Sequence, residues 1–340
     1  MPANRLKSIL LTAYGIILAL LTVYIIAMLV MIHVSAFTKA GVTDCAESAD
    51  NCDRNWMSLI ADDRKLSSIN IPGTHDSCTF NMAFKYSFSC QNSTIHDQLE
   101  TGFRFLDLRV EIDQLQDKSQ AYMVHGIGYC NDDKGNKLKL EDVLDDIYRF
   151  LEENSSETVI IMLTNEKDKN TPAEVYEYIS NLIEEKNECW YTGNTIPTLG
   201  EVRGKVVFCS RMNLDDYGER LGIDFNWPAQ TGTGSDTEAL CYSINDTEYI
   251  WAQNYSDYDI KNKWLAFEKL LDNCKAGDNA FSINYLSTST GIFLLPHPKI
   301  NAAKLNRKLL NKELVKGNNY GIVLVDYGNV EIARKIYESN

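Results

Sequence analysis

The sequence predicts an α/β fold in which short strands alternate with helices. Runs of apolar and β-branched residues are separated along the chain by amphipathic stretches, a pattern typical of parallel strands joined by helical crossovers. Polar or charged residues follow most of these strands, and a parallel barrel gathers the carboxyl ends of its strands at one mouth. A barrel is therefore favoured. An open doubly wound sheet is the alternative, although no Gly-x-Gly-x-x-Gly turn follows the first strand.

The first 40 residues differ from the rest of the chain. Arg5 and Lys7 precede an uncharged run from Ser8 to Thr38, which is longer than the ~20 apolar residues that span a bilayer. It also exceeds the roughly 7–15-residue core of a secretory signal. A buried core helix of this length would carry some charge, so we expect residues 1–40 to form a transmembrane signal-anchor. The following domain would then be extracellular or lumenal. Cleavage after Val34-Ser35-Ala36, giving a secreted protein, is the alternative.

Composition and charge narrow the possible functions. The 340 residues are 44% hydrophobic and 24% charged, as in a folded protein. The net charge of −14 argues against nucleic acid as a partner and gives no general attraction to anionic membranes. An anionic substrate therefore needs a local cationic pocket. The sequence leaves the oligomeric state open.

Cysteines and sequons favour an exported domain. Nine cysteines follow the apolar run without a Cys-x-x-Cys pair, and several would form disulfides in an oxidising compartment. The connectivity stays open, with Cys45–Cys52 and Cys78–Cys90 as two short loops that pairing could close. We expect residues 41–56 to form a cysteine-containing stalk or cap and residues 57–340 to form the barrel domain. Four sequons permit glycosylation, at Asn92, Asn154, Asn245 and Asn254.

The first strand is predicted over residues 66–70 and leads into Ile71-Pro72-Gly73-Thr74-His75-Asp76-Ser77. Pro-Gly breaks regular structure and turns the backbone. His75 and Asp76 are thereby placed on a loop at a strand end, where scaffolds commonly position catalytic side chains. A helix is predicted over residues 95–101. Residues 103–112 alternate charged and apolar side chains, which predicts a strand with Asp107 and Arg109 on one face.

The next strand ends at His125, so a second histidine follows a strand. Helical spacing of apolar residues predicts an amphipathic helix over residues 140–153. The continuous apolar run at 158–163 predicts a strand buried on both faces and ending near Glu166. Thr171-Pro172 is typical of a helix start. Further strands are predicted over 205–209, 250–253, 280–285 and 320–325, helices over 261–273 and 301–315, and long loops over 214–248.

The strand ends carry two histidines, an arginine and several carboxylates. Two imidazoles can act as general base and general acid near neutral pH. An arginine can donate two hydrogen bonds at once to phosphate oxygens. Neighbouring carboxylates stabilise the imidazolium form of a histidine. This combination suits phosphodiester cleavage with an internal hydroxyl as the nucleophile. The structural alternatives are a hydrogen-bonded His125, a plain Asp107–Arg109 ion pair inside the barrel, and Asp326 as a cap. We expect His96 and His297 on the surface and His33 at the membrane interface.

Four motifs in register resemble the phosphatidylinositol-specific phospholipase C X-domain family, in its bacterial-type, metal-independent branch. They are Ile-Pro-Gly-Thr-His-Asp-Ser (71–77), Arg-Phe-Leu-Asp-Leu-Arg (104–109), Val-His-Gly (124–126) and Val-Asp-Tyr (325–327). The resemblance extends from Trp56 to the C-terminus. It implies an irregular (β/α)₈ barrel of the TIM type. It also implies an enzyme without a cofactor.

The resemblance also implies roles for particular residues. His75 is the general base for the inositol 2-hydroxyl, supported by Asp326. His125 is the general acid for the diacylglycerol oxygen, assisted by Asp76. Arg109 takes the phosphate, with Asp107 beside it. The implied products are diacylglycerol and inositol 1,2-cyclic phosphate, and the implied substrate-binding residues are Glu166, Arg211 and Asn254.

Departures from the family pattern concern the metal and the head group. The calcium-dependent branch typically has Asn after the first catalytic His and lacks the arginine, so Asp76 and Arg109 imply no metal requirement. Thr164 stands where the bacterial enzymes have a Lys, and Asn254 stands at a family Asp. A glycan on Asn254 would obstruct the mouth of the barrel.

The substrate and two competing functions remain to be distinguished. The lipid substrate is phosphatidylinositol or a glycosylphosphatidylinositol anchor in a membrane. A non-catalytic module that binds inositol lipid or protein is a second function, disfavoured because the acid, base and phosphate positions are all present. A glycerophosphodiesterase is a third, disfavoured because no carboxylate-rich metal cluster stands out.

Overall fold

The computed structural model describes residues 3–36, 51–83, 85–115, 118–166, 169–212, 221–228, 230, 238–292 and 295–340. The chain divides into two compact units, Met1–Lys39 and Ala40–Asn340. The first unit contains helix α1 (Ala3–Ala36), and its Arg5–Val30 segment has a mean hydropathy of 2.5. The predicted apolar helix is therefore present, and it is long and apolar enough to cross a membrane.

The second unit is an irregular α/β barrel, as predicted. Parallel pairing runs in the order β8-β7-β5-β2-β1-β14-β11-β10. In the described part of the chain no ladder joins β8 to β10, and β9 (Leu240–Ser243) pairs antiparallel with β10 at that edge. The ring of strands is therefore interrupted there. The wall strands are β1 (Ile71–Thr74), β2 (Phe105–Gln114), β5 (Val159–Asn165), β7 (Val206–Ser210), β8 (Ile223–Asp224), β10 (Tyr249–Gln253), β11 (Ala280–Tyr285) and β14 (Ile322–Val325); β6 (Trp190–Tyr191) pairs with the start of β7.

Most residues of the wall strands are buried, and β5 shows why its first five residues, 159–163, are apolar. Ile160 and Met162 belong to one hydrophobic core cluster, whereas Ile161 and Leu163 belong to a second cluster that includes the apolar face of α5 (Leu140–Glu153). Alternate side chains of a strand point to opposite faces. Successive residues of β5 therefore pack into different parts of the core, as expected for a parallel strand covered by helices.

The long helices lie close to their predicted ranges. Helix α6 (Pro172–Glu185) begins with a capping box between Thr171 and Glu174. Asp259 caps α8 (Ile260–Asp272), and α9 (Pro298–Asn311) begins three residues before its predicted start. Helix α10 (Val330–Tyr337), capped by Asn329, was not predicted. The short helices are α2 (Asn51–Arg54), α3 (Lys85–Phe88), α4 (Ile95–Glu100) and α7 (Leu199–Val202).

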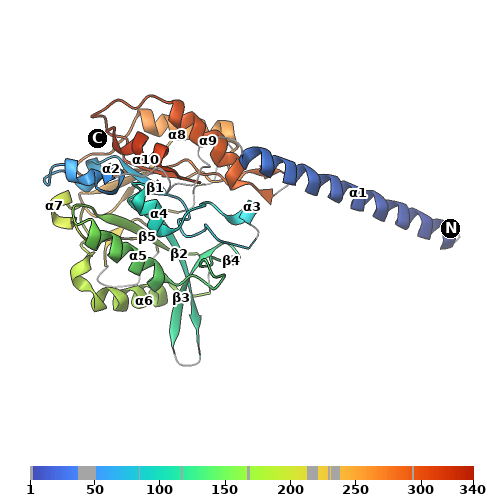
Figure 1. Cartoon of the computed structure of the whole chain (residues 1–340), viewed down its shortest axis with the longest axis horizontal. Coiled ribbons are helices and arrows are strands. Elements are labelled where there is room, and N and C mark those ends of the chain that lie inside the picture. Colours follow the sequence, from blue (N-terminus) through green and yellow to red (C-terminus); the bar gives the residue numbers. More distant parts are fainter. Residues whose placement is uncertain are drawn as a thin grey trace. The chain divides into compact units, whose positions relative to one another are not determined.

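The strand that ends at His125 is not part of the parallel wall. β3 (Ser119–His125) pairs antiparallel with β2, with Val110 opposite Met123, and β4 (Gly128–Tyr129) pairs with β3. Figure 1 shows this hairpin projecting from the barrel. The antiparallel return matters for the site, because it carries His125 back beside the part of β2 that contains Arg109.

The first strand also differs from its prediction. Leu66–Ser68 forms a 3₁₀ turn, and β1 begins at Ile71, so Pro72 and Gly73 lie inside the strand. A Cβ atom at Gly73 would lie 3.0 Å from the Phe105 Cβ. Glycine therefore allows the close approach of β1 and β2 rather than breaking the strand.

Some sequence-based expectations for single residues are wrong. His297 is 2% exposed, so it is buried and not on the surface, and His96 is half-buried. Asn154 is also buried, and its side-chain nitrogen, the atom that a glycan would need, donates to the Phe150 carbonyl. His33 has no described side chain, and the proposed cap at 41–56 lies mostly outside the described residues.

Seven cysteines whose side chains the structure describes are unpaired. The suggested Cys78–Cys90 disulfide is wrong, since both residues are buried free thiols, and Cys45 lies outside the described residues. The free thiols are Cys78, Cys90, Cys130, Cys189, Cys209, Cys241 and Cys274.

Candidate active site

A cavity of about 490 Å³ opens where the barrel strands end at their carboxyl side. Most of the residues singled out in the sequence line this one cavity, although they come from positions 75 to 326 of the chain. Asp107 is the exception; it is 1% exposed, and its carboxylate contacts the Arg109 guanidinium at 3.4 Å. The predicted residues that line the cavity are His75, Asp76, Arg109, His125, Glu166, Arg211, Asn254 and Asp326.

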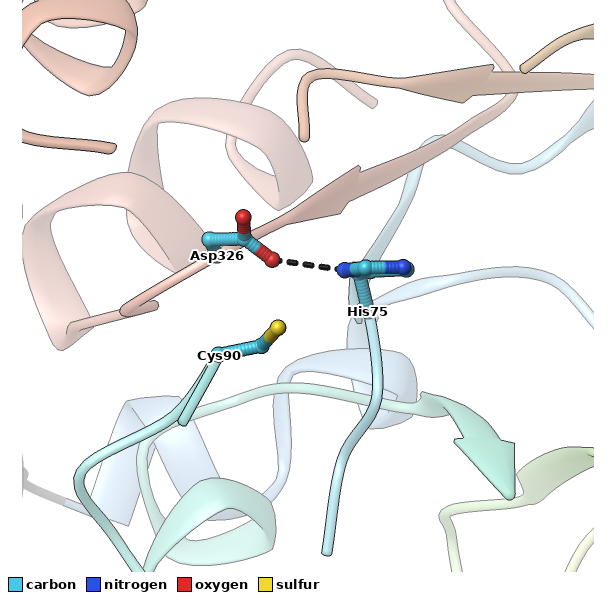
Figure 2. Close-up of side chains that lie close together, drawn as sticks. All are labelled: His75, Cys90 and Asp326. Atoms are coloured by element: carbon cyan, nitrogen blue, oxygen red, sulfur yellow. Dashed lines mark hydrogen bonds and ion pairs between the residues drawn. The ribbon is translucent and has the colours of Figure 1, made fainter. Parts of the chain in front are cut away.

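His75 and Asp326 meet because β1 and β14 are adjacent in the sheet. Thr74 pairs with Val325, so the residues that follow them extend side by side. The His75 Nδ1 lies 2.7 Å from the Asp326 Oδ1 (Figure 2). Gln91 fixes both loops, since its Nε2 donates to the carbonyls of His75 and Val325 at 2.8 and 2.9 Å.

Charge around His75 favours its protonated form. Burial lowers the pKa of His75, but the carboxylates of Asp76 and Asp326 outweigh burial, and the pKa lies above its ordinary value of 6.5. Burial raises the pKa of Asp326, with His75 acting in the opposite direction. His75 is therefore placed to accept a proton and to be stabilised as the imidazolium.

Arg109 lies at the centre of a carboxylate cluster. Its Nε is 2.5 Å from Asp76 Oδ1, its Nη1 is 3.1 Å from Glu166 Oε2, and its Nη2 is 3.4 Å from Asp107 Oδ2. Burial lowers the pKa of Arg109, but these three carboxylates raise it well above its ordinary range. The guanidinium is thereby held in one orientation at the cavity wall.

The Arg109 side chain also defines the tautomer of His75. The Nη2 lies 3.0 Å from the His75 Nε2. A guanidinium only donates hydrogen bonds, so the His75 Nε2 must accept, and the ring proton then lies on Nδ1, toward Asp326. This tautomer carries its lone pair on Nε2, and an imidazole with a free lone pair is the form that can accept a proton.

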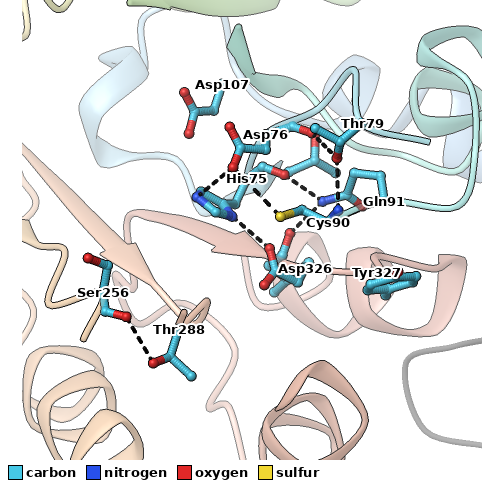
Figure 3. A network of polar contacts seen from close by, with 12 residues as sticks. His75, Asp76, Thr79, Cys90, Gln91, Asp107, Ser256, Thr288, Asp326 and Tyr327 are labelled. Atoms are coloured by element: carbon cyan, nitrogen blue, oxygen red, sulfur yellow. Dashed lines mark hydrogen bonds and ion pairs between the residues drawn. The ribbon is translucent and has the colours of Figure 1, made fainter. Parts of the chain in front are cut away.

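The carboxylate partner of His125 is Asp76. Its Nε2 lies 3.1 Å from Asp76 Oδ2, and its Nδ1 lies 2.8 Å from the Phe88 carbonyl. The same Asp76 oxygen is 3.2 Å from the His75 Nε2 (Figure 3). Burial raises the pKa of Asp76, but Arg109 and the two histidines lower it below its ordinary value. Asp76 is therefore ionised and can stabilise a proton on either imidazole.

Backbone strain occurs at two residues of this cluster. Asp76 and Tyr327, which directly follow His75 and Asp326, have φ values of 45° and 49°. Left-handed backbone at non-glycine residues costs of order 1–3 kcal/mol and is concentrated at functional sites. The two strained positions therefore mark the loops that orient the dyad.

Arg211, Trp227 and Thr164 also contribute polar groups to the lining of the cavity. The Arg211 guanidinium lies 4.6 Å from the Trp227 ring centroid. The Trp227 Nε1 and the Thr164 Oγ1 have no hydrogen-bond partner among the described residues, although both residues line the cavity. These groups can bind the hydroxyls of a polyol ligand.

Several residues of the site have no signal in the sequence. Trp227 follows β8 in a stretch predicted to be loop, and the Phe88 carbonyl that orients His125 is a backbone group.

Glu166 was expected to bind substrate. It lines the cavity, and its carboxylate also contacts Arg109 and accepts from the Gly126 N–H at 3.0 Å.

Cys90 is a further residue that sequence reasoning did not place in the site. It is 2% exposed and lines the cavity. Three groups of side chains within the described residues have donor atoms close enough to share a metal ion. They are His75–Cys90–Asp326, Asp76–Cys90–His125 and His75–Asp76–Asp107.

Two imidazoles that share the Asp76 carboxylate, one of them also paired with Asp326, and a fixed guanidinium beside them can perform proton transfer on both sides of a phosphate. The carboxylates supply the stabilisation of imidazolium, and the guanidinium supplies positive charge for phosphoryl oxygens. Residues 69–212 contain most of this cluster.

Comparison with known proteins identifies the same region. Residues 69–212 match the family model described as phosphatidylinositol-specific phospholipase C, X domain. The chain is 27% identical to 1-phosphatidylinositol phosphodiesterase of Listeria monocytogenes, covering 84% of this chain and 85% of that protein. It is 26% identical to 1-phosphatidylinositol phosphodiesterase of Staphylococcus aureus strain Newman, covering 87% and 96%.

Solved structures show the same fold. The phosphatidylinositol-specific phospholipase C of Listeria monocytogenes superimposes with a TM-score of 0.67 at 26% identity, covering 85% of this chain and 98% of that one. A variant of the Staphylococcus aureus enzyme gives a TM-score of 0.71 at 23% identity, covering 88% and 99%. Residues 69–212 thus match the phosphatidylinositol-specific phospholipase C X-domain family, and over most of its length the chain is similar to proteins named 1-phosphatidylinositol phosphodiesterase.

Proposed function

We propose that this chain cleaves phosphatidylinositol by intramolecular transfer, releasing diacylglycerol and inositol 1,2-cyclic phosphate. The observation that carries the proposal is the pair of imidazoles on either side of Asp76, with the Arg109 guanidinium beside them. The relatives named 1-phosphatidylinositol phosphodiesterase support the choice of substrate.

In the first half of the reaction, His75 is the general base. Its Nε2 takes the proton of the inositol 2-hydroxyl, and the hydroxyl oxygen forms a bond to phosphorus. The imidazolium that results is stabilised by Asp326, at 2.7 Å, and by Asp76, at 3.2 Å. Arg109 donates to the phosphoryl oxygens on which negative charge develops.

In the second half, His125 is the general acid. Its Nε2 gives a proton to the diacylglycerol oxygen as the bond from that oxygen to phosphorus breaks. The Asp76 carboxylate lies 3.1 Å from that Nε2 and can accept a hydrogen bond from its N–H before the transfer. The Phe88 carbonyl accepts from Nδ1–H and keeps the ring oriented. Hydrolysis of the cyclic ester can follow with the two histidines in exchanged roles.

The positive charge for this chemistry is assigned to Arg109, and no metal ion is required by the mechanism. A guanidinium ion-paired to three carboxylates is permanently charged and fixed in position. Arg211, Asn254, Thr164 and Trp227 are proposed to contact the inositol hydroxyls, because they line the remaining wall of the cavity.

The apolar helix α1 is proposed as a single-pass membrane anchor, with the barrel extracellular or lumenal. Its length and hydropathy support this function, and Arg5 and Lys7 at its amino end favour a cytoplasmic N-terminus. Cleavage of the segment, which would release the barrel, is tested by sequencing the N-terminus of the mature protein.

The proposed activity is tested with the full-length chain in mixed micelles of detergent and phosphatidylinositol, in excess chelator. Phosphorus NMR should show inositol 1,2-cyclic phosphate with the wild type and none with His75→Ala. Tight binding of the lipid without turnover would instead support the non-catalytic module. A glycosylphosphatidylinositol-anchored protein tested in parallel defines whether lipid anchors are also substrates, and activity that appears only on adding calcium would contradict the role of Arg109.

A further inference from the structure

Cys90 gives the cavity a chemical property that the proposed reaction does not use. Its Sγ lies 3.6 Å from Asp76 Oδ2, and the His125 Nε2 lies 3.1 Å from the same oxygen. All three donor atoms lie within 4.8 Å of one another. A thiolate, an imidazole and a carboxylate form a donor set that zinc prefers.

The tautomer of His125 supports a cation at this position. The Nδ1 faces a backbone carbonyl at 2.8 Å, and a carbonyl only accepts, so the ring proton of a neutral His125 lies on Nδ1. The Nε2 of that tautomer then faces the Asp76 carboxylate oxygen at 3.1 Å, and a cation between these two acceptors would satisfy both. That cation is a proton or a metal ion. Metal-binding histidines usually donate their other N–H to a carbonyl or carboxylate, as His125 does to Phe88.

Two of the three ligand separations fit a tetrahedral zinc ion, and the third, between the Cys90 Sγ and the His125 Nε2, is within 4.8 Å. With Zn–O and Zn–N bonds of about 2.0 Å and a Zn–S bond of about 2.3 Å, neighbouring ligands lie about 3.3 Å apart for O and N and about 3.5 Å apart for O and S. The observed separations are 3.1 and 3.6 Å. The alternative set of His75, Cys90 and Asp326 (Figure 2) fits less well, because its nitrogen and oxygen are only 2.7 Å apart.

The charge around the three ligands also favours a cation. Four carboxylates surround the two imidazoles, whereas Arg109 is the guanidinium that neutralises them. The Arg109 Nε contacts the Oδ1 of Asp76, whereas the Oδ2 faces the His125 Nε2, the Cys90 Sγ and the His75 Nε2. Because all three ligands line the cavity, an ion reaches them from solvent.

We propose that Asp76, Cys90 and His125 form an inhibitory zinc site. On binding, zinc takes the places of the protons on the Cys90 sulfur and, where present, on the His125 Nε2, and these protons pass to solvent. Water or hydroxide from the cavity completes the coordination. Inhibition, which rests on the proposed function, follows because the ion occupies the nitrogen that must protonate the leaving group. Binding of the ion does not depend on that function.

The binding test uses Co²⁺ as a spectroscopic probe with the reduced full-length chain in detergent. The wild type should take up one Co²⁺ at micromolar concentration with a thiolate-to-cobalt absorption band in the near ultraviolet, and Zn²⁺ should displace it. Cys90→Ser should abolish the band and weaken Zn²⁺ binding at least about tenfold. Cys241→Ser is the matched control, because it removes an exposed free thiol, and it should retain both properties.

Two further measurements keep the test decisive. His125→Ala alters a partly exposed side chain and should weaken Zn²⁺ binding with an unchanged circular dichroism spectrum, even if Cys90→Ser does not fold. Zn²⁺ should inhibit phosphatidylinositol cleavage by the wild type, and a chelator should reverse the inhibition. Absence of the band in the wild type, or equal Zn²⁺ affinity in Cys90→Ser, would overturn the site. Inactivity of the wild type with a normal cobalt band would instead overturn the proposed function.

Discussion

Replacing Asp326 by Asn separates the charge of the dyad from its shape. The amide has nearly the size of the carboxylate, and its oxygen can still accept from the His75 Nδ1–H, now 2.7 Å from Asp326. The negative charge is lost. The carboxylate raises the pKa of His75 against the lowering effect of burial, so its removal leaves burial as the larger influence and the pKa should fall.

The magnitude follows from the role of a general base. A positioned base contributes roughly 10²–10⁴-fold to a rate, and the stabilisation of its imidazolium is what Asp326 supplies. We therefore expect kcat/KM for phosphatidylinositol to fall by about 10²–10⁴-fold, equivalent to about 3–5 kcal/mol. The sign of the pH effect is definite. A raised pKa keeps the base protonated to higher pH, so the acidic limb of the wild-type profile should lie above pH 6.5, and in Asp326→Asn it should move to lower pH.

The assay is the pH profile of kcat/KM on mixed micelles. Asp113→Asn is the control, because it makes the same charge change on the β2–β3 hairpin, where Asp113 pairs with Lys137 at 2.7 Å. It should leave both the rate and the acidic limb unchanged. A loss below tenfold in Asp326→Asn, or an acidic limb that does not move, would refute the assignment of Asp326 as the partner of the base.

Three more predictions concern buried charges. Arg109→Lys keeps one positive charge but loses the planar guanidinium, which can donate two hydrogen bonds to phosphate oxygens. In the same assay kcat/KM should therefore fall by about 10²–10³-fold. A loss of tenfold or less would contradict the role of Arg109. Arg104→Met should lower the free energy of unfolding, measured by chemical denaturation, by about 3–5 kcal/mol. The reason is that the fully buried Glu157, which lies 2.9 Å from Arg104, would lose its cation. A double variant with Glu157→Gln should recover part of the lost stability. Burial lowers the pKa of Lys263 from 10.5 to about 7, so the free energy of unfolding of the wild type relative to Lys263→Met should rise as the pH increases between these values, and a flat difference would contradict it.

The sequence predicted the fold best where periodicity is strong and local. Helix 140–153 and strand 280–285 have the predicted bounds, because amphipathic spacing and apolar runs are local signals. The direction of β3 depends on its pairing with β2, and hydrophobic pattern does not encode direction. Pro72 and Gly73 were misread because their position in β1 is determined by the approach of Phe105, a contact distant in sequence.

The same distinction between local sequence signals and contacts distant in sequence applies to the candidate site. His75, Arg109 and His125 were found from the chemistry of their side chains and their positions at strand ends, and they line one cavity. The Phe88 carbonyl was missed because every residue has such a group. Cys90 was interpreted as a disulfide partner because cysteine spacing does not show which thiols meet.

The separate roles of the two histidines are tested most directly by changing the leaving group. Diacylglycerol needs a proton as it leaves, whereas nitrophenol, in a nitrophenyl inositol phosphate, leaves as a stable anion. His125→Ala should therefore lose about 10²–10⁴-fold in kcat/KM on phosphatidylinositol but retain most of its activity on the nitrophenyl ester, while His75→Ala should lose activity on both. Equal losses by His125→Ala on the two substrates would contradict the assignment of His125 as the general acid.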